Sequence, residues 1–187
     1  MNKFQHVAFT PRVLAAQHSA YGRTYAIAPD PGRDPLGQDE VAFVAARDSF
    51  YMATVSESGW PYVQHRGGPP GFLAVLDAHT LAFADLRGNR QLVSIGNLAT
   101  NDRVALILVD YPNRARLKLL AHAELVPADA DPALTARLAP EGKTKLVERL
   151  VRLHVVGFDW NCPQNITPRF TQAEVDAYVA RQSHRAE

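Results

Sequence analysis

Two short segments of the sequence combine arginines, amide side chains and glycines. Residues 64–71 read Gln-His-Arg-Gly-Gly-Pro-Pro-Gly, and residues 85–91 read Asp-Leu-Arg-Gly-Asn-Arg-Gln. Glycine lets the backbone approach a ligand closely, and an arginine can bind a phosphate through two parallel hydrogen bonds. The second segment also precedes an expected helix, whose N-terminal N–H groups favour an anion. Both segments therefore predict phosphate binding, with an ordinary hairpin loop and a solvated turn as the respective alternatives.

A third polar segment covers residues 159–170 and reads Asp-Trp-Asn-Cys-Pro-Gln-Asn-Ile-Thr-Pro-Arg-Phe. A loop that gathers an aromatic ring, amides and an arginine after an apolar strand is typical of ligand-facing loops. Trp160 fits either a ring-stacking role or packing in the core. Cys162 is the one cysteine of the chain, so it can form no intramolecular disulfide, and we interpret it as a passive small residue.

The composition and the missing motifs disfavour several classes of protein. The chain has 20 basic and 19 acidic side chains, so a net charge of +1 gives no sign of nucleic acid as a partner. Its seven histidines are scattered without ligand spacing, and we expect no metal. The longest apolar run, residues 104–109, is too short to cross a bilayer, and the first residues hold no apolar run of signal-peptide length. Because a lone cysteine also suits a reducing compartment, we expect a cytoplasmic protein without a membrane partner.

The 187 residues suffice for one domain with terminal appendages. Capping residues and apolar spacing predict helices over 10–20, 39–47, 90–100, 131–138 and 172–182, with Asn89 as the cap of the third. Alternating and β-branched residues predict strands over 51–55, 60–66, 72–76, 80–84, 103–109, 114–126 and about 149–158. Turn signals at short spacing between the strands predict a mainly β protein, either a small barrel or a strongly curved antiparallel sheet with helices at its margins.

Two of the expected strands carry further information. The continuous apolar run of residues 103–109 suggests burial on both faces of that strand. Arg114, Arg116 and Lys118 would share one face of the next strand. We interpret these three cations as charges that block pairing at an exposed sheet edge.

Residues 50–77, 81–112 and 158–170 closely resemble the pyridoxamine 5′-phosphate oxidase-like flavoproteins with the FMN-binding split barrel. The similarity covers about residues 40–170, and its most specific strings are GNRQ, NLATNDRVAL and DWNCPQ. It implies a six-stranded antiparallel split β-barrel with peripheral helices. It also implies a homodimer with two FMN molecules at the subunit interface, to which both subunits contribute.

The resemblance assigns residues to the phosphate end of the cofactor. Arg66 matches the family arginine at the end of the second barrel strand. Asn89 and Arg90 match the basic pair that holds the FMN phosphate, although the commoner arginine-lysine order is not kept. The oxidase has a lysine shortly after the first arginine, whereas residues 69–72 here read Pro-Pro-Gly-Phe. We expect Arg87 to take the place of that lysine.

Trp160 and Arg169 fall where the oxidase has a tryptophan and an arginine that reach the cofactor, with slightly different spacing. Hydrogen bonds to the flavin ring are expected from Gln64 or His65. The complete set of expected cofactor-binding residues is Gln64, His65, Arg66, Gly67, Arg87, Asn89, Arg90, Gln91, Trp160 and Arg169.

The resemblance implies an FMN-dependent oxidoreductase that acts on a small organic molecule by hydride transfer through the flavin, with NAD(P)H as a candidate electron source. The carboxy-terminal arginine, histidine and arginine pattern that binds pyridoxal phosphate is not evident, which argues against pyridoxamine phosphate oxidation itself. The alternatives are a non-catalytic flavin-binding or sensing protein and a split barrel that binds haem or a deazaflavin. We expect an N-terminal helix and loop over 1–38, the FMN-binding domain over 39–170 and a C-terminal helix over 171–187.

Overall fold

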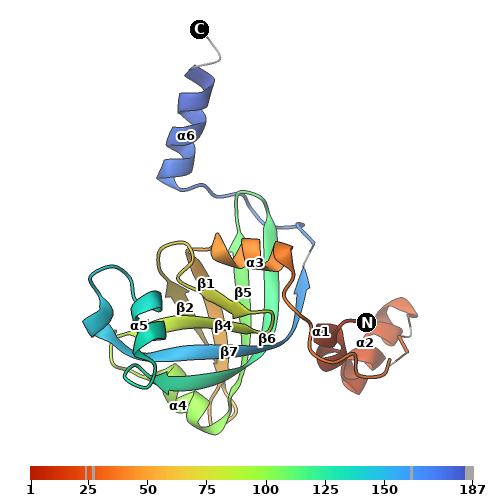
Figure 1. Cartoon of the computed structure of the whole chain (residues 1–187). Helices are drawn as coiled ribbons and strands as arrows, with labels where there is room; N and C mark the ends of the chain where they lie inside the picture. The colour runs from red at the N-terminus through yellow and green to blue at the C-terminus, as the bar shows by residue number, and fades with distance from the viewer. Residues whose placement is uncertain (24, 27, 161, 184–187) are drawn as a thin grey trace.

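The computed structural model describes residues 1–23, 25–26, 28–160 and 162–183. Seven antiparallel strands form one sheet in the order β2-β1-β5-β6-β7-β4-β3 (Figure 1). The strands are β1 (Ser49–Val55), β2 (Pro61–Gly67), β3 (Ala74–Asp77), β4 (Thr80–Leu86), β5 (Arg103–Asp110), β6 (Ala115–Pro127) and β7 (Val147–Trp160). The predicted mainly β class with an antiparallel sheet is confirmed, and the short β3 is counted among its seven strands.

The helices lie around the sheet, also as predicted (Figure 1). They are α1 (Lys3–Ala8), α2 (Pro11–Tyr21), α3 (Gln38–Ala45), α4 (Val93–Thr100), α5 (Pro132–Leu138) and α6 (Gln172–Ser183), with a 3₁₀ turn over Thr144–Leu146. The short α1 was missed, since its six residues carry little periodicity. Among the described residues no helix is both long and apolar enough to span a membrane.

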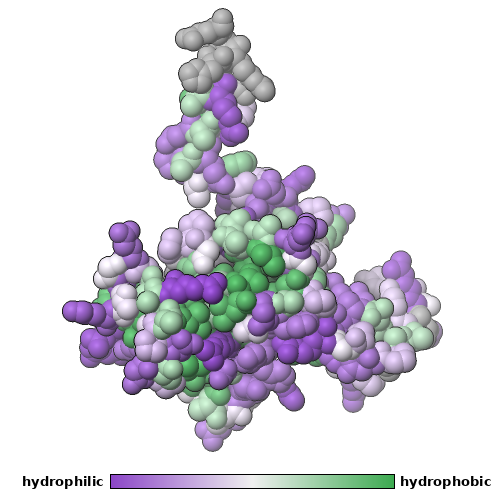
Figure 2. All heavy atoms as spheres, viewed as in Figure 1, coloured by the Kyte–Doolittle hydropathy of each residue, from purple (hydrophilic) through white to green (hydrophobic). Residues whose placement is uncertain are grey.

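Side-chain alternation along the strands builds the core. Phe50 and Met52 on β1 are buried and point to the same side as Leu106 and Leu108 on β5. The rings of Phe50 and Phe83 meet edge to face with centroids 5.4 Å apart. Figure 2 shows hydrophobic side chains gathered on the body below α3, whereas polar side chains predominate on the projecting ends.

Two of the strand interpretations are wrong. Burial alternates along β5, so Val104, Leu106 and Leu108 are buried while Ala105 is exposed and Ile107 is half-buried. Within one chain, the apolar run is therefore covered on one face only. Strand β6 lies between β5 and β7, so its cations do not protect a sheet edge.

Side chains close the gap between the two ends of the sheet. Strand β2 is one edge strand, yet Arg66 on β2 forms a salt bridge with Asp85 on β4, with Nη1 2.8 Å from Oδ1. Helix α4 packs on the β1–β2 side of this gap, because Ser94 Oγ lies 2.8 Å from Gln64 Oε1 and Asn97 Nδ2 donates to Thr54 Oγ1 at 2.9 Å. We call this line of contacts between β2 and β4 the seam.

Candidate functional site

The seam contains a cavity of about 180 Å³, which we call the seam pocket. Alternate residues of β2 point into it, since Tyr62, Gln64 and Arg66 are half-buried there whereas the residues between them are exposed. The remaining walls come from the end of β4, residues 88–92, the first turn of α4 and Glu148 on β7. Five expected cofactor-binding residues line this pocket: Gln64, Arg66, Asn89, Arg90 and Gln91.

The loop that follows β4 has an unusual backbone. Arg90 has φ of 60° and Leu92 has φ of 53°, a left-handed conformation that is uncommon for residues other than glycine. Helix α4 begins only at Val93, so the expected start at residue 90 is wrong. Asn89 does not cap the helix, because its Oδ1 accepts a hydrogen bond from the N–H of Gln91 at 3.1 Å. Such conformations cluster at ligand-binding sites, where other interactions hold them.

The N-terminus of α4 faces the same pocket. Its N-cap residue is Leu92, so within the described chain no side chain satisfies the first N–H groups of the helix. Val93, Ser94 and Ile95 all line the pocket. These N–H groups and the positive end of the helix dipole favour an anion.

Arginines and carboxylates form a connected network beside the pocket. Asp85 is buried and accepts from Arg66 through Oδ1 at 2.8 Å and from Arg149 through Oδ2 at 2.7 Å. Glu148 contacts Arg149 at 3.1 Å and Arg87 at 3.4 Å. Three arginines thus share two carboxylates, and Arg90 adds a further positive charge at the mouth of the pocket. The local charge is positive although the whole chain is nearly neutral.

One donor in this network is unsatisfied. Arg66 Nε is buried and has no hydrogen-bond partner among the described residues. A buried donor without an acceptor costs about 1–3 kcal/mol and more when it is charged, so such a group calls for an explanation. An anionic group in the seam pocket would supply the acceptor. The residues present therefore fit a phosphate group.

Three other expected residues lie near the pocket but do not line it. His65 is on the opposite face of β2, where its ring meets Tyr51 with centroids 5.4 Å apart. Gly67 is exposed at the end of β2. Arg87 is 57% exposed and pairs with Glu148, so it reaches the pocket only through that carboxylate. Whether these residues touch a cofactor stays a prediction.

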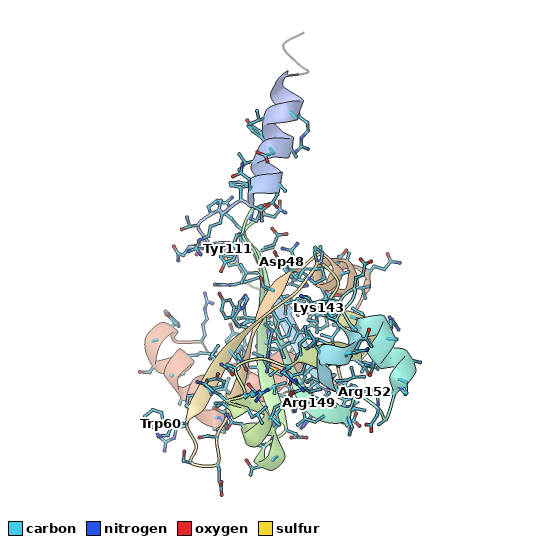
Figure 3. The ribbon with its side chains drawn as sticks, turned by 90° about the vertical axis from the view of Figure 1, so that its left-hand side faces the viewer. Asp48, Trp60, Tyr111, Lys143, Arg149 and Arg152 are labelled. Carbon is cyan, nitrogen blue, oxygen red and sulfur yellow. The ribbon has the colours of Figure 1, made fainter. Side chains whose placement is uncertain are left out.

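Trp160 and Arg169 lie at the other end of the barrel. Strand β7 begins beside the seam, where Val147 pairs with Leu86, and Trp160 ends the same strand 13 residues later. At roughly 3.3 Å per residue the two ends are about 40 Å apart along the strand. In Figure 3, Arg149 lies low in the body, whereas Tyr111, which contacts Arg169, lies near the top below α6. Neither Trp160 nor Arg169 lines the seam pocket of its own chain.

Both side chains have partners at that upper end. Trp160 Nε1 donates to Glu40 Oε1 at 2.7 Å, and its ring meets Phe43 edge to face at 4.8 Å. The guanidinium carbon of Arg169 lies 5.0 Å from the centre of the Tyr111 ring. Trp160 therefore anchors α3 to β7 and is still 40% exposed. The neighbouring Cys162 is exposed.

The sheet also has an open apolar face. Tyr51, Ala53 and Val63 on β1 and β2, with Ile107 on β5 and Leu120 on β6, line a shallow groove of about 220 Å³. Tyr51 is 40% and Val63 is 60% exposed. We call this side of β2, β1, β5 and β6 the outer face. Its apolar residues face solvent in a single chain.

The sequence interpretation missed three residues of the site. Asp85 and Arg149 were not identified as partners, although they pair directly across β4 and β7. Their opposite charges become informative only when the register between the two strands is known. Ser94 gave no signal, because a serine in a helical pattern is common. Across the described ranges, no group of three histidine, cysteine, aspartate or glutamate side chains is placed to hold a metal ion.

The family model for pyridoxamine 5′-phosphate oxidase matches residues 36–155, about two thirds of the chain. A presumed pyridoxamine 5′-phosphate oxidase from Lactobacillus delbrueckii has a similar structure, with a TM-score of 0.51, 24% identity, and coverage of 67% of this chain and 94% of that one. HupZ from Group A Streptococcus gives a TM-score of 0.51 at 14% identity, covering 72% and 100% of the two chains. A protein of the pyridoxinephosphate oxidase family from Clostridium acetobutylicum gives 0.50 at 16% identity, covering 66% and 85%. No curated protein matches the chain.

Proposed function

Because the chain belongs to the pyridoxamine 5′-phosphate oxidase family, we propose that it is an FMN-dependent oxidoreductase and that the seam pocket holds the FMN phosphate. The observation that carries the proposal is the buried, unsatisfied Arg66 Nε beside the uncapped N-terminus of α4. The two features converge on one cavity, and an anion there would supply an acceptor to both.

The residues of the pocket have distinct parts in this proposal. Arg66, fixed by Asp85, would donate from its Nε, and Arg90 would add a second guanidinium from the solvent side. The N–H groups at the start of α4 complete the phosphate site. Bound FMN would supply the two-electron chemistry, so the protein needs to provide position and electrostatics rather than an acid or a base. This agrees with the lack of a catalytic triad signature in the sequence.

A second copy of the chain completes the site in this proposal. Small-molecule sites are usually about 300–1,000 Å³, so a pocket of about 180 Å³ holds only part of FMN. Trp160 and Arg169 do not line the seam pocket of their own chain, and in this proposal they reach the cofactor from a partner. The outer face supports a homodimer, because β5 has the continuous apolar sequence of a strand covered on both faces.

Titration of the purified protein with FMN tests cofactor binding. Arg90 is exposed and forms no ion pair in the described part of the chain, so Arg90→Ala removes a contact without disturbing the fold. We expect this change to weaken FMN binding by about 1.5–3 kcal/mol, the value of a hydrogen bond to a charged group. Arg137→Ala on α5 removes the same charge from an exposed position and should leave the affinity unchanged.

Three results would contradict the assignment. Arg90→Ala and Arg137→Ala could bind FMN equally well, which would place the phosphate elsewhere. The protein could take up haem or a deazaflavin in preference to FMN, or it could bind none of them. Catalysis is tested separately: NADH or NADPH should bleach the flavin absorption, and oxygen should restore it. A flavin that binds but is not reduced by either nucleotide or by other electron donors would favour a storage or sensing role.

A further inference from the structure

A second cationic pocket lies beside the turn at Tyr111 and has no lining residue in common with the seam pocket. It has a volume of about 240 Å³ and is enclosed by the outward side of β5 and β6, the turn at Tyr111 and residues 165–169. We call it the turn pocket. Its two cations are Arg116 on β6 and Arg169 on the loop after β7.

Arg116 has the same unexplained feature as Arg66. Its Nε is buried and finds no hydrogen-bond acceptor among the described residues. Edge protection does not account for this arginine, because β6 is an interior strand. Exposed arginines keep their donors in water, so a buried guanidinium N–H at a pocket wall indicates a site for an acceptor.

The surrounding residues hold the pocket open. Asp110, at the end of β5, accepts from Asn113 N at 3.0 Å and pairs with Arg47 at 2.8 Å, which fixes the turn that carries Tyr111. The Arg169 guanidinium lies over the face of the Tyr111 ring, 5.0 Å from its centre. Asn165 has φ of 64°, so the loop opposite Arg116 also has a constrained backbone.

An apolar groove adjoins the turn pocket. Pro112 and Phe170 follow directly after Tyr111 and Arg169, and with Val175 and Tyr178 of α6 they line a cavity of about 480 Å³. Glu174 and Arg181 of α6 add one charge of each sign to its wall. Phe170 is 62% and Tyr178 is 60% exposed. Cationic and aromatic surfaces thus lie side by side.

We propose that the turn pocket binds the anionic group of an organic carboxylate or phosphate ester, and that the adjoining groove binds its aromatic or aliphatic body. Arg116 and Arg169 would face the anion, with Phe170 and Tyr178 beside the body. That this ligand is the substrate rests on the proposed oxidoreductase function; the binding itself does not. Residues 165–181 lie outside the family match at 36–155, whereas Arg116 lies inside it.

Phenyl phosphate and benzoate are suitable probes, with inorganic phosphate and benzyl alcohol for comparison. Binding is measured by calorimetry on the FMN-saturated protein, in which FMN would occupy the seam pocket. It is also measured on Arg90→Ala, so that an anion bound in the seam pocket is distinguished from one bound in the turn pocket. We expect Arg116→Gln and Arg169→Gln each to lower the affinity for phenyl phosphate and for benzoate by about tenfold or more. Arg137→Gln should change their affinity less than about twofold. Arg169 is exposed, so Arg169→Gln should fold even if Arg116→Gln does not. Because the proposed function also places Arg169 at the FMN of a partner, all variants are compared at full FMN occupancy.

The opposite results would overturn the proposal in identifiable ways. Equal affinities for the wild type and both glutamine variants would remove the turn pocket as an anion site. A loss with Arg90→Ala alone would assign the anion to the seam pocket. A parallel loss of FMN affinity in Arg116→Gln would show that the turn pocket holds the cofactor itself. Equal affinities for inorganic phosphate and phenyl phosphate would show that the groove does not bind the organic part of the ligand. Failure of FMN to bind would reject the proposed function and leave the anion measurements to decide this inference.

Discussion

Arg66 Nη1 on β2 lies 2.8 Å from Asp85 Oδ1 on β4, although four strands separate β2 from β4 in the sheet order. The same carboxylate also binds Arg149, so one buried aspartate holds two largely buried arginines. This contact closes the barrel and also fixes the arginine that we place against the FMN phosphate. Stability and cofactor binding thus depend on the same residue.

Asp85→Asn should therefore destabilise the protein strongly. The asparagine leaves Arg66 without a counter-charge and Arg149 with Glu148 alone, and breaking a buried pair in this way costs about 3–5 kcal/mol. Chemical denaturation at neutral pH measures the loss in the free energy of unfolding. Asp102→Asn is the matched control, since Asp102 is 56% exposed beside His122 and such pairs contribute about 0–1 kcal/mol. Similar losses in the two variants would refute the structural importance of the Asp85 network.

Gly157→Ala should loosen the N-terminal segment. A Cβ at Gly157 would lie 2.5 Å from Phe4 N and 2.9 Å from Asp34 Oδ2, at the place where Asp34 also accepts from Lys3 N. This is tighter than any normal contact, so α1 must move away from β7. We expect a loss of about 1–3 kcal/mol, as for other overpacked sites, and faster proteolysis before residue 36.

Gly96→Ala is the control for that change. A Cβ at Gly96 meets nothing within 4 Å, and the residue is exposed in the interior of α4. Alanine should raise the free energy of unfolding by about 0.5–1 kcal/mol, because it restricts the unfolded chain and favours the helix. If both glycine variants behave alike in proteolysis, the N-terminal segment does not depend on close contact with β7.

Asp110 makes the stability of the folded protein depend on pH in the acidic range. Burial acts to raise the pKa of Asp110, but hydrogen bonds from Asn113 and the charge of Arg47 outweigh it, so the pKa lies below its ordinary value of 3.8. The folded state then binds fewer protons than the unfolded state. The resulting stabilisation is complete above the unfolded pKa and is lost as the pH falls through the folded one.

Asp110→Asn should remove this dependence. At pH 7 we expect the free energy of unfolding to fall by about 1.5–3 kcal/mol, because hydrogen bonds to a charged group are lost. This difference in the free energy of unfolding should shrink as the pH falls below about 4, where Asp110 becomes protonated first in the unfolded state and, at lower pH, in the folded state. Urea titrations across this range test it, with the exposed Asp129→Asn expected to change little at any pH. A constant difference at every pH would contradict the assignment to Asp110.

The sequence predicted the local elements well, because period-two alternation and capping residues are local signals. It failed where a property depends on which strands are neighbours. Arg116 was interpreted as a charge at a sheet edge, yet it belongs to an interior strand with a buried Nε. Asp85 and Arg149 are 64 residues apart and meet only through the β4–β7 register. Sequence proximity likewise could not reveal that Trp160 and Arg90 lie at opposite ends of one barrel.

Val63→Lys should disrupt the homodimer that we propose. Val63 is 60% exposed on the outer face, and a charge at the centre of an apolar interface would have to be desolvated. We expect the wild type to have the mass of two chains in light scattering and the variant the mass of one. Because Trp160 and Arg169 would then be lost from the site, FMN affinity should fall together with dimer content. Tyr21→Lys changes an equally accessible side chain, 76% exposed on α2, and should remain dimeric. A wild-type protein that is monomeric and still binds FMN tightly would contradict the shared site.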